Sequence, residues 1–136
     1  GMSSELVQLI DRLEQEHAAV REALGALGAL AEAGDAAELR SALPARAAVL
    51  GAGLDDHSLT EDATLFPAIA DAVGPDLVGV FAAEHVEILA LRDELYGGGD
   101  DVTAPCLGLC ALLESHMERE ELVLFPSARD LLDERS

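Results

Sequence analysis

The chain has 136 residues, of which 27 are Asp or Glu, and its formal net charge at pH 7 is -19. All 8 basic residues are arginines, and 50% of the residues are hydrophobic, which argues against disorder because disordered chains combine high net charge with low hydrophobicity. The acid excess argues against nucleic acid and membrane surfaces as partners, because both attract Lys and Arg. A single domain over residues 2–136 is long enough to bury its own core.

The start of the chain and its cysteines predict a soluble cytoplasmic protein. Gly1 precedes Met2, so we expect Gly1 to be the remnant of a cleaved tag. The start shows no signal-peptide pattern, and no apolar run reaches the roughly 18 residues of a membrane span. Cys106 and Cys110 lie four residues apart, a spacing unsuited to a disulfide, so we expect two buried free thiols. Nothing in the sequence indicates the oligomeric state.

Four stretches show the apolar spacing of amphipathic helices, in which hydrophobic residues recur every three or four positions. The first follows the start signal Ser3-Ser4-Glu5 and ends before Gly34. The second runs from about Asp35 to Phe66, with Pro44 restarting it and two glycines weakening its middle.

The third stretch starts with Pro75 at its first helical position and stops at Gly97. The fourth has Thr103 as its predicted N-cap and runs to Phe125-Pro126. Pro67 and Pro126 are expected to kink or end the second and fourth helices. Because no segment alternates like a strand, the sequence predicts an all-α fold, an up-down-up-down four-helix bundle.

A duplication carries the histidines. Residues 57–67 match residues 116–126 without a gap, and both copies read His-x-x-x-Glu, a second acid, and then Leu-Phe-Pro. A weaker match pairs Glu16-His17 with Glu84-His85. The chain therefore reads as two helical hairpins related by a pseudo-two-fold axis, each containing Glu-His followed by His-x-x-x-Glu.

The duplicated residues are candidate metal ligands. Residues four apart differ by about 40° around a helix, so the histidine and the glutamate of each His-x-x-x-Glu motif share a face. One histidine on an apolar face is usually a hydrogen-bonded core residue. Four of them, two with a glutamate one turn on, predict a buried metal site, because a buried carboxylate must be paired or bind metal. The candidate ligands are His17, His57, Glu61, His85, His116 and Glu120.

Four imidazoles and two carboxylates are too many ligands for one tetrahedral zinc ion. Two metal ions sharing both carboxylates fit better, and this mixture of donors suits iron, with zinc or manganese as alternatives. A ferritin-like di-iron bundle needs Glu-x-x-His on two helices, and Glu14-x-x-His17 is the only such spacing in the chain. The ligand count therefore argues against a ferritin-like site.

With this order of ligands and with both Leu-Phe-Pro segments, the sequence resembles the hemerythrin-like, or HHE cation-binding, domains from about Leu6 to Pro126. The resemblance implies a four-helix bundle that holds a non-haem di-iron centre. It also implies that the four histidines bind the two irons and that Glu61 and Glu120 bridge them, together with an oxo or hydroxo group.

One position departs from the oxygen-carrying members of that family, which have a fifth histidine four residues along the third helix. That neighbour of His85 is Leu89 here, with Phe81 on the other side, so each iron would have two histidines and an open position. This departure disfavours reversible oxygen storage. It leaves a protein that binds, senses or reacts with O2, peroxide or NO, as an oxidoreductase or as a sensor. The alternative is a zinc-bound or metal-free helical interaction module.

The acids next to the candidate ligands are expected on the solvated surface, because a one-residue step rotates about 100° around a helix. These four are Glu16, Asp62, Glu84 and Glu121. Contact with a histidine N–H is the alternative for them, and Glu14 is a candidate acceptor for His17. Tyr96 and Met117 are expected to pack in the bundle.

Overall fold

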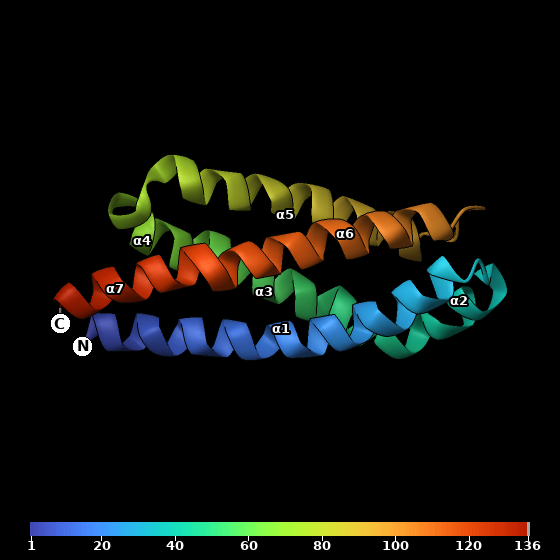
Figure 1. Ribbon diagram of the computed structural model, residues 1–136, viewed down its shortest axis with the longest axis horizontal. Coiled ribbons are helices and arrows are strands. Elements are labelled where there is room, and N and C mark those ends of the chain that lie inside the picture. The colour runs from blue at the N-terminus through green and yellow to red at the C-terminus, as the bar shows by residue number, and fades with distance from the viewer. Residues whose placement is uncertain (136) are drawn as a thin grey trace.

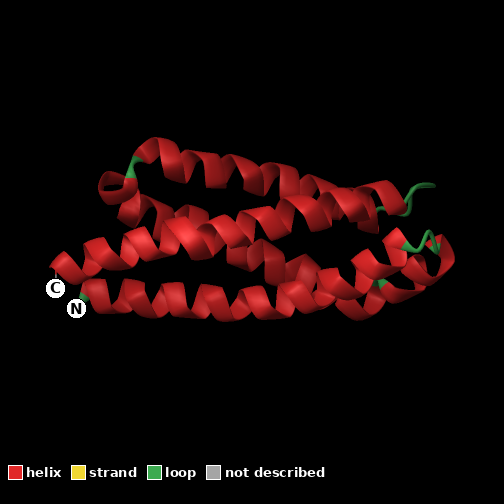
Figure 2. Cartoon of the chain, viewed as in Figure 1, coloured by secondary structure: helices red, strands yellow, loops and turns green. Residues whose placement is uncertain are grey.

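The computed structural model describes residues 1–135, and all regular structure in that range is helical (Figure 2). The all-α prediction is therefore confirmed. Helix α1 (Met2–Glu32) already contains Ser3 and Ser4, so the predicted start signal does not cap it; the Glu5 amide donates to the Gly1 carbonyl instead. The helix ends as predicted before Gly34, whose φ of 73° belongs to the left-handed region that favours glycine.

The second run is broken into several segments rather than forming one helix. Asp35 caps its first segment, since the Asp35 carboxylate accepts a hydrogen bond from the Glu38 amide at 3.1 Å. Short 3₁₀ and π-helical turns follow where the proline and the two glycines were expected to weaken the helix. The segments are α2 (Ala36–Ala42), η1 (Pro44–Arg46), η2 (Val49–Gly53), α3 (Leu54–Thr60), η3 (Glu61–Leu65) and α4 (Phe66–Val73).

The remaining helices are α5 (Pro75–Tyr96), α6 (Thr103–Arg119), η4 (Glu120–Leu124) and α7 (Phe125–Arg135). The N-cap prediction for Thr103 is wrong, because Thr103 is already the first helical residue. The Asp101 carboxylate takes the capping role from one turn earlier and accepts from the Ala104 amide at 3.1 Å.

The two Leu-Phe-Pro segments do not end their helices. A π-helical turn precedes each proline, and the amide of Phe66 or Phe125 donates to the carbonyl of Glu61 or Glu120, five residues earlier. The proline follows as an early residue of the next α-helix, where its missing N–H costs little. The helical path therefore continues into α4 and α7, and the expected disturbance takes the form of a π turn.

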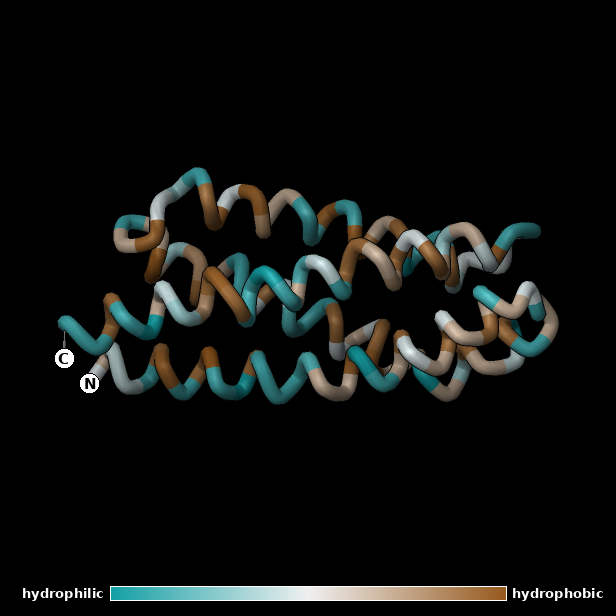
Figure 3. Tube along the Cα trace, viewed as in Figure 1, coloured by the Kyte–Doolittle hydropathy of each residue, from teal (hydrophilic) through white to brown (hydrophobic). Residues whose placement is uncertain are grey.

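The helices lie side by side along the long axis of the molecule, and both termini lie at the same end (Figure 1). Helix α1 contacts α6 and α7, α5 contacts α6, and α4 contacts both α5 and α7. This arrangement gives every helical run neighbours that are distant in the sequence. Apolar and polar residues are interspersed along every helical run (Figure 3). In the described part of the chain, no helix has the length and the apolar content needed to cross a bilayer.

Buried apolar side chains form two clusters, and a buried polar layer lies between them. The first cluster includes Leu13, Phe81 and Phe125, and the second includes Val20 and Ile88. Along α1 and α5 a buried histidine separates the two clusters. The polar layer contains all four histidines and two glutamates, each at most 6% exposed: His17, His57, Glu61, His85, His116 and Glu120.

Among the residues whose burial the structure describes, one further charged residue is buried, and it stabilises the π turn before α3. Arg92 on α5 donates to the carbonyls of Leu50 and Gly51 at 2.7 and 3.1 Å and forms an ion pair with Asp55 at 2.7 Å. The carbonyls of Leu50 and Gly51 lie in this irregular turn, where Arg92 supplies hydrogen-bond donors to them. Tyr96 packs against the second cluster as predicted, and its hydroxyl donates to the Leu43 carbonyl.

Candidate metal centre

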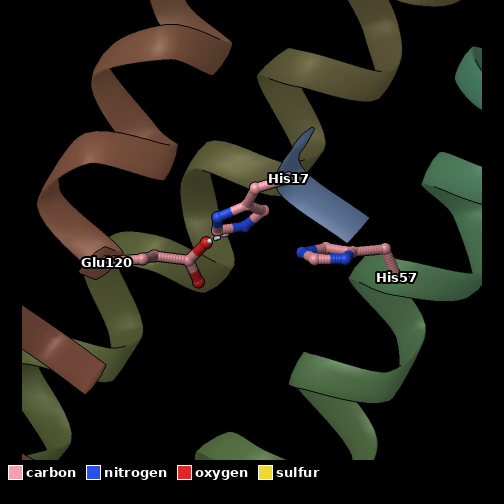
Figure 4. Close-up of side chains that lie close together, drawn as sticks. All are labelled: His17, His57 and Glu120. Atoms are coloured by element: carbon pink, nitrogen blue, oxygen red, sulfur yellow. Dashed lines mark ion pairs between the residues drawn. The ribbon is translucent and has the colours of Figure 1, made fainter. Parts of the chain in front are cut away.

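The six candidate ligands meet in two clusters of three, and in each cluster the potential donor atoms lie within 4.8 Å of one another. His17, His57 and Glu120 form one cluster, and their side chains point toward one another from α1, α3 and η4 (Figure 4). The second cluster consists of Glu61, His85 and His116. Each glutamate thus joins the histidines of the other hairpin as well as following a histidine in its own.

Each carboxylate lies close to histidines of both clusters. Glu120 Oε1 is 3.2 Å from His17 Nε2 and 3.4 Å from His116 Nε2. Glu61 Oε1 is 2.9 Å from His85 Nε2 and 3.7 Å from His57 Nε2. Because each carboxylate approaches one histidine of either cluster, the arrangement suits two metal ions that share both glutamates.

The outer nitrogen of every histidine is held by a carboxylate. The Nδ1 atoms of His17, His57, His85 and His116 lie 2.7, 2.8, 2.8 and 2.8 Å from oxygens of Glu121, Glu16, Asp62 and Glu84, respectively. A histidine that donates its Nδ1 hydrogen to a carboxylate presents an unprotonated Nε2, which is the form that binds metal. All four Nε2 atoms therefore face the interior as potential ligands.

The alternative prediction, contact with a histidine N–H, holds for each of these four acids. Glu16 and Asp62 also keep side chains that are 42% and 41% exposed, whereas those of Glu84 and Glu121 are 17% and 25% exposed. A rotation of about 100° from the ligand leaves each acid at the edge of its helix, where it can reach a histidine of a neighbouring helix. The repeat contained the signal, since all four acids adjoin a candidate ligand in both copies. Glu14 is not the acceptor for His17; it pairs with Arg129 at 2.5 Å.

Two arginines extend these contacts outward. Arg21 donates to both oxygens of Glu121 at 2.8 and 2.9 Å, and Arg119 donates to both oxygens of Glu84 at 2.8 and 2.6 Å. Such bidentate pairs fix the carboxylate geometrically as well as electrostatically. The ion pairs lower the pKa of Glu121 and Glu84 despite partial burial, so that both remain charged acceptors.

The phenylalanines of the two Leu-Phe-Pro segments cover the centre on one side. Phe125 stacks on His17 with ring centroids 5.9 Å apart, and Phe66 stacks on His85 at 5.7 Å. Phe81 meets His116 edge-on at 5.2 Å. These rings belong to the first apolar cluster. The repeated phenylalanine thus orients a histidine of the opposite hairpin and excludes water from that side of the centre.

The two buried glutamates differ in charge. Burial, followed by the negative charge of Glu61, raises the pKa of Glu120 well above its ordinary value. Burial also acts to raise the pKa of Glu61, but the polar groups of Glu120, His116 and His85 around it outweigh burial, and the pKa of Glu61 lies below the ordinary value. These opposite shifts in pKa favour a charged Glu61 beside a protonated Glu120 in the metal-free pair.

The interior atoms of this centre lack the partners that buried polar atoms require. Among the residues that the structure describes, the buried side-chain atoms without a hydrogen-bond partner include two histidine nitrogens and three carboxylate oxygens of the centre. Leaving such atoms unpaired is costly. Imidazole nitrogen and carboxylate oxygen are good donors for divalent metals, so the residues fit a two-metal centre. The unpaired atoms are His17 Nε2, His116 Nε2, Glu61 Oε2, and Glu120 Oε1 and Oε2.

A small cavity adjoins the centre on the side opposite the phenylalanines. The four histidines line it, together with Ser58 and apolar side chains such as Leu54 and Met117, whereas Glu61 and Glu120 do not. The centre of a water molecule could move within about 10 Å³ of this cavity. This volume is on the order of what one water needs. Met117 packs in the bundle as predicted, and Cys106 is a buried free thiol; Cys110 is free but only partly buried.

Comparison with protein families matches residues 8–128 to the hemerythrin HHE cation-binding domain. The chain belongs to this family. The resemblance inferred from the histidine and glutamate motifs is therefore confirmed, and metal-ion binding is the property that the hemerythrin HHE domain carries in its description. No curated protein and no solved structure matches the chain in the corresponding comparisons.

Proposed function

We propose that this protein is a non-haem di-iron protein that binds, senses or reacts with O2, peroxide or NO. The observation that carries the proposal is the pair of buried His-His-Glu clusters, whose interior atoms face one another while each outer histidine nitrogen is held by a carboxylate. Two bound iron ions would supply redox chemistry and coordination positions for a small ligand.

In this proposal the chain's own residues have distinct roles. His17, His57 and Glu120 hold one ion, and Glu61, His85 and His116 hold the other, with both glutamates shared. The outer carboxylates keep each histidine in the tautomer that leaves Nε2 free. The phenylalanines restrict water on one side, which leaves the cavity on the histidine side as the place for a small ligand.

We further propose that residues 2–136 form one up-down-up-down four-helix bundle with an internal pseudo-two-fold repeat. The helix contacts and the shared position of the termini support this architecture. The contacts of the centre support the repeat, because equivalent residues make equivalent bonds. Glu16 and Glu84 contact the later histidine of their own hairpin, and Asp62 and Glu121 contact the first histidine of the other hairpin.

The test is metal analysis of protein produced with iron available, combined with absorption spectra in air, with peroxide and with NO. We expect about two irons per chain, one for each cluster, and charge-transfer bands that respond to at least one of these ligands. His57→Ala should lose iron and the bands. Ser41→Ala, at an exposed serine whose hydroxyl bonds the Ala37 carbonyl, serves as the control and should keep both.

Other results would point elsewhere. Zinc in place of iron, or a folded protein without metal and without a spectral response, would favour the helical interaction module. If iron is present, turnover of peroxide or NO that disappears in His57→Ala would identify an oxidoreductase. A spectral and conformational response without turnover would identify a sensor.

A further inference from the structure

One buried polar group beside the centre has no role in the contacts described so far. Ser58 follows His57 on α3 and is 3% exposed, and its hydroxyl has no hydrogen-bond partner among the residues that the structure describes. A helical serine ordinarily bonds the carbonyl four residues earlier. Ser41 does so, donating to the Ala37 carbonyl at 3.0 Å. The Ser58 hydroxyl therefore remains available although water is largely excluded from it.

Ser58 is part of the wall of the cavity beside the centre. Ser58 and the four histidines are the polar residues of its wall, and the rest of the wall is apolar. Each histidine already has its Nδ1 atom engaged by a carboxylate and its Nε2 atom turned to the metal centre. Once metals occupy the Nε2 atoms, Ser58 is the hydrogen-bond donor that this wall can offer to a molecule in the cavity.

We propose that the Ser58 hydroxyl donates a hydrogen bond to a small anionic ligand held in this cavity beside the metal centre. The inference rests on the proposed two-metal function and assigns the residue that selects the ligand. The other cavity residues are apolar or would bind the metals. They can fit around an anion, but they have no further hydrogen-bond donor for it. Hydrogen bonds to charged acceptors are stronger than neutral ones, and a nearly dry cavity strengthens them further.

Azide is a suitable probe because it is a small anion with a terminal acceptor. Iron-loaded, air-oxidised protein would be titrated with azide for the unchanged chain, for Ser58→Ala and for the control Ser41→Ala. We expect the azide Kd to rise about 10-fold in Ser58→Ala, the loss of one hydrogen bond to an anion, and to stay unchanged in Ser41→Ala. Iron content should be the same in all three proteins.

Two further measurements separate a ligand contact from a structural role. The vibrational band of bound azide should shift in D2O for the unchanged chain and not for Ser58→Ala. Only the unchanged chain has an exchangeable hydroxyl hydrogen, that of Ser58, bonded to the azide. The thermal stability of metal-free Ser58→Ala should equal or exceed that of the unchanged chain, since the substitution removes an unpaired buried hydroxyl.

The outcomes are distinguishable. Equal azide affinity and an equal D2O response in the unchanged chain and in Ser58→Ala would overturn the role of Ser58 while leaving the two-metal function intact. A chain that takes up no iron would overturn both proposals, whereas an iron-loaded chain that binds no azide would overturn the role of Ser58 alone.

Discussion

The metal centre has two sides that differ in how firmly they are held. His17 and His116 form the clamped side with Glu120, because arginines hold the carboxylates behind both histidines, Glu121 and Glu84. The open side is formed by His57, His85 and Glu61. Behind its histidines lie Glu16 and Asp62, whose side chains are 42% and 41% exposed. On this side, Arg12 Nε lies 3.8 Å from Glu16 Oε2.

The difference shows which parts of the site the duplication copied. The histidines, glutamates and outer acids occur in both hairpins, but the arginines do not. Arg21 lies four residues after His17, where the position after His85 is Leu89, and Arg119 lies three after His116, where the position after His57 is Thr60. Each proposed metal ion therefore has one clamped and one open histidine. The repeat determines the ligands, and unrepeated residues determine how rigidly they are held.

The largest expected effect comes from removing an outer carboxylate on the clamped side. Glu121→Ala should weaken metal binding by about 10–100-fold, because it frees His17 and also removes the carboxylate that Arg21 holds with two hydrogen bonds, which leaves Arg21 with Glu114 as its partner. Glu16→Ala, on the open side, should have a smaller effect, since water can reach the Nδ1 atom of His57 in place of the exposed carboxylate. Competition with a chelator would measure both affinities. Equal losses would show that the clamp contributes nothing to binding.

The glutamates of the two sides should respond oppositely in the metal-free protein. The raised pKa of Glu120 means that the folded state retains a proton that the unfolded state releases above pH 4.5, so this group lowers stability as the pH rises. Glu120→Gln should therefore raise Tm at about pH 7.5 relative to the unchanged chain, with a smaller gain at about pH 5.

Glu61→Gln should do the reverse. The lowered pKa of Glu61 contributes stability above pH 4.5 that is lost on acidification, and glutamine cannot supply it. One pKa unit corresponds to about 1.4 kcal/mol, or on the order of 3–6 °C in Tm for a domain of this size. Circular dichroism melts of chelator-treated protein would measure both variants, and shifts of the same sign would refute the assignment of the proton to Glu120.

The smallest effect is expected from the arginines themselves. Arg21→Gln should weaken metal binding a few-fold, because Glu121 keeps its bond to His17 but loses the two bonds that fix its orientation. Arg12→Gln is the matched change on the open side and should be neutral, since the Arg12 side chain is 58% exposed and an exposed ion pair at 3.8 Å contributes little. Chelator competition at low and high salt would separate orientation from general electrostatics.

The sequence predicted the candidate ligands and the all-α class because both depend on spacing within one helix. His57 and Glu61 share a face whatever surrounds them. The acceptor roles of Glu16 and Asp62 were predicted only as the alternative, because these roles depend on which helix lies alongside, and that information is not local. The π turns were missed for a related reason. Proline signals a lost N–H, but tertiary packing decides whether the helix ends or absorbs the change by widening one turn.

The π turns that begin at Glu61 and Glu120 have a consequence for the phase of the helices. A widened turn accommodates one extra residue. It therefore changes the direction in which Phe66 points around the helix axis relative to His57 and Glu61. Without the widened turn, a regular helix through the same residues would turn everything after it by about 100°. Phe66 would then leave the ring of His85, while the histidine–glutamate spacing stayed intact. The π turn thus separates two features of the same helical run. The spacing of His57 and Glu61 aligns the ligands, and the one extra residue in the turn sets where Phe66 covers the centre.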